Sequence, residues 1–149
     1  MKTLKESAVE YTLKKKKMDG FRRAKITTSR GAANYARNFY SDDIGIYEST
    51  FILMFDRSMN TIGYAKISQG GVSGTVVDIR IILKYAVESL ATGVMLFHNH
   101  PSGSLNPSPQ DINITKKLQE AMRWMDILLL DHIILTEDAY YSFADEGVV

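Results

Sequence analysis

The chain has 149 residues, 45% of them hydrophobic, and a formal net charge of +1. Its length and apolar content are those of one globular domain with a buried core, and no apolar stretch reaches the roughly 18 residues that a membrane-spanning helix needs. The sequence contains no cysteine, which excludes disulfides, thiolate zinc clusters and a cysteine nucleophile. A transition-metal site would therefore have to be built from His, Asp and Glu.

Positive charge is concentrated in residues 1–25. This segment has nine Lys or Arg against three Asp or Glu, while residues 26–149 have nine against fourteen, so the two parts carry about +6 and −5. Partial alternation at Val9, Tyr11 and Leu13 indicates a basic arm or a peripheral strand. The basic residues could bind nucleic acid or an acidic partner surface, but a solvated arm, or an edge strand whose lysines block further pairing, is the favoured interpretation. Because the segment lacks the apolar region of a secretion signal, we expect a cytoplasmic protein with no membrane association.

Residues 26–149 are expected to form one domain. Patterns in its first half predict a helix over 27–40, strands over 44–56 and 61–68 joined by a turn at 57–60, and a helix over 78–93. Gly93 is placed to end that second helix. Its buried side is predicted to consist of Ile81, Ile82, Tyr85, Ala86 and Leu90. The glycine-rich segment 68–75 is predicted to be a loop, because it lacks the Gly-Lys-Ser/Thr of a phosphate-binding loop.

The second half continues the alternation of strands and helices. It predicts a strand over 94–97 that leads to His98, a helix over 109–124, and strands over 126–136 and 139–143. The buried side of this helix is expected to contain Ile114, Leu118 and Met122. Because hairpins and helical crossovers both occur, the fold class is α/β, with a mixed, mostly antiparallel sheet flanked by about three helices.

The stretch that points most directly to chemistry is FHNHPSGSLNPSPQD, residues 97–111. If the strand continues through its start, His98 and His100 project from the same face, while Asn99 projects from the other. Pro101 favours extended geometry at His100 and so holds this arrangement. Asn99, Ser102 and Gly103 could shape the site or the substrate groove, but a role in shaping the turn is the favoured assignment.

Ser108 and Asp111 have the spacing of a helix start, with Ser108 at the N-cap and Pro109 at the first helical position. Such a helix would bring Asp111 back toward the paired histidines. Two imidazoles and one carboxylate form a ligand set that zinc accepts, with a fourth position left for water, as in catalytic sites. Zinc lowers the pKa of such a water to about 7. For Ser108 and Asp111 alone, a helix cap without a metal is the alternative.

Glu48 is the candidate for the group that accepts a proton from this water. It is the first acid of the segment IYESTFILMF and has apolar neighbours, where a solvent-exposed acid would be out of place. An ordinary edge-strand acid is the alternative. His132, in LLDHIIL, could support a metal ligand, but a core histidine hydrogen-bonded to backbone is the favoured interpretation.

The spacing of these residues resembles the JAMM (MPN-plus) metalloprotease signature. The matching positions are Glu48, His98-Asn99-His100 and, after seven further residues, Ser108 and Asp111. Within that superfamily, HNHPSG, LLDHIIL and YYSFADEG resemble the bacterial RadC proteins. The resemblance implies the JAB/MPN fold, with layering similar to that of cytidine deaminases. It also implies one zinc ion per chain, bound by His98, His100 and Asp111. Glu48 would then be the general base, and Ser108 would donate to the developing oxyanion.

A JAMM-like site implies hydrolysis of amide or isopeptide bonds in a peptide or protein substrate. Two alternatives are a metal-binding accessory module and a nuclease acting in DNA repair. The letters HNH do not favour a nuclease, because nucleases of that name take these residues from positions spread over a ββα unit. Residues 1–25 do not resemble the helix-hairpin-helix region usual in RadC proteins, which weakens a DNA-repair role. The sequence predicts neither the substrate nor the oligomeric state.

Overall fold

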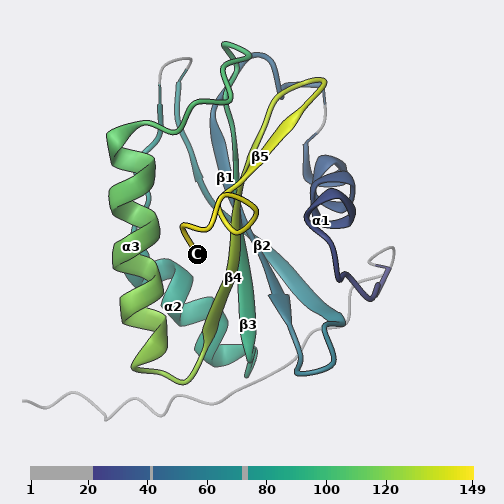
Figure 1. The fold of residues 1–149 in the computed structure, drawn as a ribbon, viewed down its shortest axis with the longest axis vertical. Helices are drawn as coiled ribbons and strands as arrows, with labels where there is room; N and C mark the ends of the chain where they lie inside the picture. The colour runs from purple at the N-terminus through teal and green to yellow at the C-terminus, as the bar shows by residue number, and fades with distance from the viewer. Residues whose placement is uncertain (1–21, 41, 72–73) are drawn as a thin grey trace, which may run out of the picture.

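A computed structural model describes residues 22–40, 42–71 and 74–149 of the chain (Figure 1). Most of the basic segment, including the strand expected at residues 9–13, lies outside these ranges. The end of that segment is attached to the rest of the domain through Ala24. Its carbonyl accepts from the Thr61 N–H at 2.8 Å, and its own N–H donates to the Thr61 hydroxyl at 2.9 Å.

Five strands form one mixed sheet. They are β1 (Ser49–Phe55), β2 (Thr61–Gln69), β3 (Gly93–Asn99), β4 (Leu128–Leu135) and β5 (Tyr140–Ser142). Their order is β2-β1-β3-β4-β5, with β3 and β4 parallel and the other neighbours antiparallel. β1 and β3 are buried along their whole length, which accounts for their almost continuous apolar sequences. The predicted mixed, mostly antiparallel sheet is confirmed.

Helices cover both faces of the sheet (Figure 1). They are α1 (Ser29–Ala36), followed by a 3₁₀ turn at Arg37–Phe39, α2 (Ile79–Glu88) and α3 (Pro109–Arg123). α1 lies on one face, whereas α2 and α3 lie on the other. Within the described ranges, no helix has the length and apolar character needed to cross a membrane. The predicted α/β fold is confirmed, and the described residues form three α-helices where the sequence predicts about three.

Alternating side chains of the central strands divide the core between the two faces. On β3, Phe97 packs in the cluster that includes α1, while Leu96 packs in the cluster that includes Leu118 of α3. Because side chains alternate along a strand, the next two residues continue this pattern. His98 therefore lies on the α3 face and Asn99 on the α1 face, and both are buried.

α2 ends earlier than the sequence predicts. Its last residue is Glu88, and Leu90 then adopts a left-handed backbone with φ of 55°. The Ala91 N–H donates back to the last turn of the helix and closes it. The prediction that Gly93 ends the helix was wrong. Gly93 is the first residue of β3, where a Cβ would lie 2.6 Å from the Leu130 side chain, so the glycine permits close packing of β3 and β4.

The buried side of α2 is also narrower than predicted. Ile82 and Ala86 are buried and Tyr85 packs against them, but Ile81 and Leu90 are 39% and 67% exposed. The early end of the helix removes Leu90 from its apolar side. Only the residues on one narrow face of α2 therefore reach the sheet.

α3 presents a polar residue to the interior. Leu118 and Met122 are buried as predicted, but Ile114 is only partly buried, and Thr115 is fully buried instead. A buried hydroxyl needs hydrogen-bond partners. Those of Thr115 are the Asp111 carbonyl and the ring of His132, which connects α3 to β4 through polar contacts.

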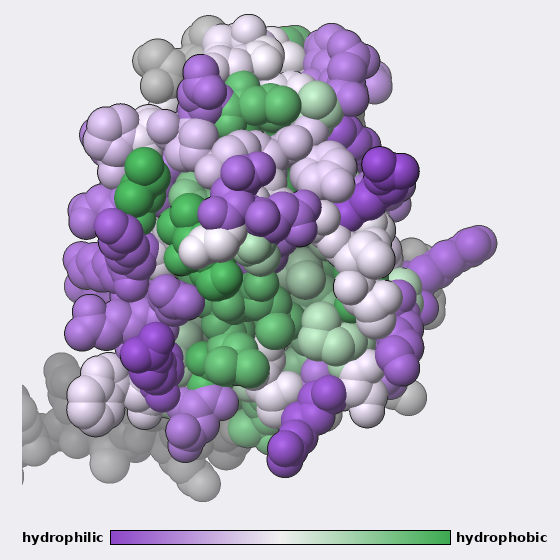
Figure 2. Space-filling model, in the orientation of Figure 1, coloured by the Kyte–Doolittle hydropathy of each residue, from purple (hydrophilic) through white to green (hydrophobic). Residues whose placement is uncertain are grey.

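The sheet edge at β4 is only partly covered. β5 pairs with residues 133–135, and among the residues that the structure describes no strand lies beside the start of β4, which includes the exposed Leu128. Figure 2 shows apolar side chains gathered on this face of the molecule. The β4 partners of β3 pass from Leu129 directly to Asp131, so Leu130 forms a bulge. The bulge interrupts the row of backbone groups that a further strand would use.

Replacing Leu90 by glycine should stabilise the protein. A residue other than glycine in the left-handed region costs roughly 1–2 kcal/mol, and Leu90 is largely exposed, so little burial is lost. We expect Leu90→Gly to raise the free energy of unfolding in urea by about 1 kcal/mol. Lys84→Gly, in the middle of α2, should lower it by roughly 0.5–1 kcal/mol. Equal destabilisation by both substitutions would contradict this account of the helix end.

Candidate metal centre

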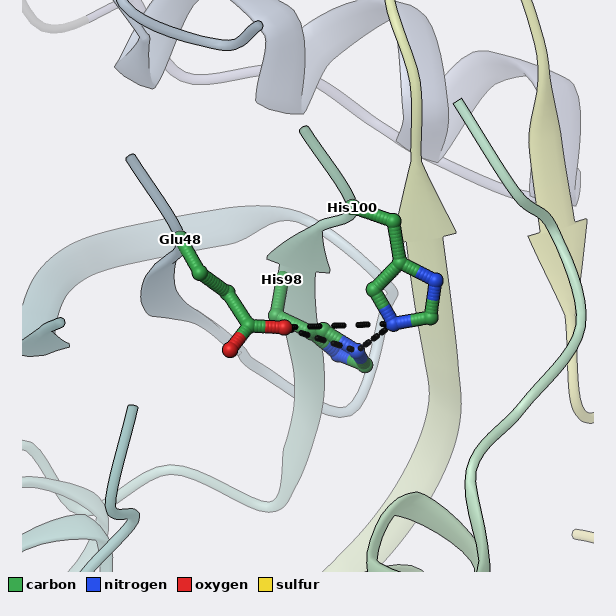
Figure 3. A group of neighbouring side chains, drawn as sticks. All are labelled: Glu48, His98 and His100. Carbon is green, nitrogen blue, oxygen red and sulfur yellow. Dashed lines mark hydrogen bonds and ion pairs between the residues drawn. The ribbon is translucent and has the colours of Figure 1, made fainter. Parts of the chain in front are cut away.

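Two histidines meet at the end of β3. His98 is buried in the strand. His100 follows the strand, and its backbone N–H donates to the Leu135 carbonyl of β4 at 2.9 Å. Their Nε2 atoms lie 2.9 Å apart (Figure 3). The predicted arrangement, in which both rings share one face, is confirmed.

Asp111 is brought to the histidines by the start of α3. The Asp111 N–H donates to the Ser108 hydroxyl at 3.0 Å, and the Ser108 N–H donates to Asp111 Oδ2 at 2.8 Å, which completes the predicted capping box. Asp111 Oδ1 lies 3.2 Å from His98 Nε2, and Oδ2 lies 3.3 Å from His100 Nε2. The cap and the contact with the histidines therefore use the same carboxylate. The Ser108 carbonyl also accepts from the Ile112 N–H at 3.1 Å, so the backbone of Ser108 is joined to the first turn of α3.

Glu48 reaches the two histidines from a different segment of the chain, one residue before β1. Its Oε1 lies 4.0 Å from His98 Nε2 and 3.9 Å from His100 Nε2, and Figure 3 shows the carboxylate directed at both rings. The side chain is only 14% exposed. Its expected withdrawal from solvent is confirmed, although Glu48 precedes the strand in which the sequence placed it.

The glycine-rich loop after β2 holds the backbone of Glu48. The Glu48 N–H donates to the Gly71 carbonyl at 3.2 Å, and the Gly70 N–H donates to the Glu48 carbonyl at 2.8 Å. At Gly70 a Cβ would lie 1.8 Å from the Gly74 carbonyl oxygen, so only glycine allows the loop to close there. The predicted loop is confirmed at Gly70, Gly71, Gly74 and Thr75, whereas Ser68 and Gln69 still belong to β2, and the loop serves to support the carboxylate.

Asn99 fixes the chain on both sides of Glu48. Its Nδ2 donates to the Ile44 and Tyr47 carbonyls at 2.6 and 2.7 Å, and its Oδ1 accepts from the Ser49 N–H at 2.8 Å. The favoured assignment of Asn99 to the following turn was wrong, because its partners are Ile44 and Tyr47, before β1, and Ser49, the first residue of β1. One signal was present in the sequence: a polar side chain opposite two inward-facing histidines must enter the core and find partners there.

His132 contacts the site through its ring. Its Nε2 lies 2.7 Å from His98 Nδ1, its Nδ1 lies 2.6 Å from Thr115 Oγ1, and Phe143 stacks on it at 4.5 Å between ring centres. The favoured interpretation of a core histidine bonded to backbone was wrong, because both ring nitrogens meet side chains. Burial, together with the neighbouring His98, lowers the pKa of His132 well below its usual range. The ring is therefore neutral at neutral pH.

The contacts between Asp111 and the histidines shift the pKa values of these groups. Burial by itself would raise the pKa of Asp111, but its contacts with His100 and His98 hold that pKa well below its usual range. The hydrogen bond to Asp111 raises the pKa of His100 against the opposing effect of burial. Asp111 is thus a carboxylate, and the site attracts positive charge.

The donor atoms have the spacing of a metal site. One nitrogen of each histidine and one oxygen of Glu48 lie within 4.8 Å of one another, so this group could hold a metal ion. Ligands at about 2.0–2.1 Å from a tetrahedral zinc would lie roughly 3.3 Å apart. The Asp111–histidine distances of 3.2 and 3.3 Å agree with this spacing, the 2.9 Å between the two histidine Nε2 atoms is shorter, and the Glu48 distances of 3.9 and 4.0 Å are longer.

The hydrogen bond of His100 also suits a metal ligand. Its Nδ1 lies 2.8 Å from the Ser104 carbonyl oxygen. A carbonyl can only accept, so Nδ1 carries the proton and the neutral ring has a lone pair on Nε2. That lone pair faces His98 and Asp111, which is an unfavourable arrangement unless a proton or metal cation lies between them.

Removal of the Asn99 side chain should destabilise the fold. Asn99→Ala leaves one buried N–H and two partly buried carbonyls without their Asn99 partner, and loss of a partner for a buried group costs about 1–3 kcal/mol. We expect a loss of at least about 2 kcal/mol in urea unfolding. Asn113→Ala, at an exposed position of α3, should change stability by less than about 0.5 kcal/mol. Similar stabilities for the two variants would contradict the role of Asn99.

Known proteins are similar in sequence to this chain over most of its length. Residues 26–148 match the RadC-like JAB domain family. The chain is 40% identical over 142 residues to a UPF0758 protein of Flavobacterium johnsoniae, covering 95% of this chain and 61% of that protein. It is 42% identical over 129 residues to a UPF0758 protein of Porphyromonas gingivalis, covering 86% and 56% of the two chains.

A third relative is a UPF0758 protein of Streptococcus sanguinis, which is 36% identical over 117 residues and of which 52% is covered. The chain thus spans between half and about three fifths of the length of these relatives, and their shared name states no activity. The mixed sheet with three helices is consistent with the JAB/MPN fold that the motif implied. This chain belongs to the RadC-like JAB domain family.

Proposed function

We propose that this protein is a zinc-dependent hydrolase of peptide or isopeptide bonds. The observation that carries the proposal is the convergence of two imidazoles and one carboxylate at ligand spacing, with a second carboxylate slightly farther away. Three such ligands leave one position of a tetrahedral zinc open, as in catalytic sites. A purely structural metal site would not need the second carboxylate.

His98, His100 and Asp111 would hold the metal. Imidazole nitrogen and carboxylate oxygen are both zinc donors, and the chain has no cysteine to compete with them. When bound, zinc supplies a Lewis acid that polarises a substrate carbonyl and makes water reactive at neutral pH. The capping box orients Asp111, and the Ser104 carbonyl orients His100, so both ligands are held before the metal arrives.

Glu48 would act as the general base. Its Oε1 lies 3.9–4.0 Å from both Nε2 atoms, beyond direct hydrogen-bond range but close enough to reach a water between them. The carboxylate would accept a proton from the attacking water and deliver it to the leaving amine. Its limited exposure keeps this proton transfer away from bulk solvent.

Ser108 would stabilise the negative oxygen that develops on the substrate carbonyl. Its Oγ accepts the Asp111 N–H, which leaves the hydroxyl proton available for donation. A donor aimed at a developing oxyanion contributes more in a partly buried site than in water. The proposed substrate is a peptide or protein.

Metal analysis tests the ligand assignment. Purified protein loaded with zinc and then freed of excess metal should retain about one ion per chain, and His98→Ala or Asp111→Ala should retain much less, because each loses one of three ligands. Asp138→Ala, an exposed acid, is the control and should retain zinc like the wild type. Stoichiometric zinc in both ligand variants would contradict the assignment.

Hydrolysis by Glu48→Gln tests the reaction. The substitution keeps the size of the side chain but removes the base, so zinc should stay bound while cleavage in a screen of peptide and isopeptide substrates falls about 100- to 10,000-fold. Glu88→Gln, at an exposed position of α2, should leave cleavage unchanged. Cleavage of DNA instead would favour the nuclease alternative, and cleavage of neither class would favour a binding module.

A further inference from the structure

We propose that Thr115 and His132 are positioning residues that fix the tautomer of His98, so that its Nε2 presents a lone pair to the metal. The inference rests on the metal site of the proposed function. It concerns three buried side chains joined by short contacts: Thr115 on α3, His132 on β4 and His98 on β3. The direction of each hydrogen bond in this series of contacts follows from the one before it.

The chain starts at the Asp111 carbonyl. Thr115 Oγ1 lies 2.6 Å from this oxygen and 2.6 Å from His132 Nδ1. The carbonyl can only accept, so the single hydroxyl proton of Thr115 is donated to Asp111. The Thr115 oxygen is then the acceptor toward His132, and the proton of that contact must be on His132 Nδ1.

The second contact transmits this polarity to the metal ligand. A neutral imidazole has one proton, so His132 with its proton on Nδ1 has a lone pair on Nε2. That nitrogen lies 2.7 Å from His98 Nδ1. His98 must therefore donate from Nδ1, which leaves its Nε2 unprotonated and available as a ligand.

The same arrangement links two of the proposed metal ligands. Asp111 supplies its side chain to the site and its backbone carbonyl to Thr115, while His98 supplies Nε2 to the site and Nδ1 to His132. The hydrogen-bond chain thus closes a loop around the metal position. Partners of this kind orient ligands, and losing one typically costs about 10- to 100-fold in metal affinity.

Packing also holds His132 in place, but packing does not select a tautomer. Phe143 stacks on the ring at 4.5 Å with an angle of 7° between the planes. Stacking would position either tautomer equally well, whereas only one of them matches both polar neighbours. A test must therefore change the polarity of the chain while keeping the shape of its members.

Zinc affinity, measured by competition with a chromophoric chelator, makes this distinction. Thr115→Val keeps the shape but removes the acceptor for His132, and His132→Leu removes the acceptor for His98. Both should weaken zinc binding about 10- to 100-fold. Thr115→Ser and His132→Gln keep a donor and an acceptor at each position and should bind zinc nearly as tightly as the wild type.

A matched control separates this effect from general destabilisation. Thr61 is also buried, and its hydroxyl accepts from the Ala24 N–H. It begins β2 and pairs with Phe55, at the end of β1 that is remote from Glu48, so Thr61→Val loses a hydrogen bond without touching the site. Its zinc affinity should be unchanged. Unchanged affinity in folded Thr115→Val and His132→Leu would overturn the proposal, as would equal weakening by Thr61→Val.

Nitrogen NMR of the histidine rings tests the tautomer without relying on activity. In metal-free wild type at alkaline pH, His98 should carry its proton on Nδ1, with a coupling across the hydrogen bond to His132 Nε2, and Thr115→Val should show a mixture of tautomers. A wild-type His98 protonated on Nε2 would overturn the proposal. If the wild type binds no zinc, the proposed function fails, while the tautomer result still decides this inference.

Discussion

The alternation of side chains at the end of β3 is the constraint on which the site depends. His98 and Asn99 are neighbours in the chain but project to opposite faces of a sheet that is buried on both sides. His98 faces α3 and meets Asp111 and His132, whereas Asn99 faces α1 and binds the backbone around Glu48. One dipeptide thereby places His98 beside Asp111 on one face and holds the backbone of Glu48 from the other.

The site is rigid because its members have second roles in the fold. Asp111 completes the N-terminal cap of α3 with the same carboxylate that contacts the histidines. Glu48 is held by the glycine-rich loop, and His132 by stacking on Phe143. Ligands positioned in this way lose little conformational freedom on binding a metal, and this favours tight binding.

Local sequence rules predicted the parts of the site that depend on periodicity and capping. The shared face of the histidines and the capping box at Ser108 follow from the strand repeat and from helix-start chemistry, and the structure has both. The partners of Asn99 and His132 come from segments that are distant in sequence, so no local pattern identifies them. His132 is adjacent to Leu96 only through the parallel pairing of β3 and β4. The early end of α2 was missed because Leu90 takes a backbone conformation that its residue type rarely adopts.

The most direct test of the account is a crystal structure of the zinc-loaded protein with anomalous diffraction recorded at the zinc edge. The account predicts one peak within about 2.0–2.2 Å of His98 Nε2, His100 Nε2 and an oxygen of Asp111. The Glu48 carboxylate should lie outside bonding distance and contact the remaining zinc ligand. A metal bound by Glu48 in place of Asp111, or no peak between the histidines, would contradict the account.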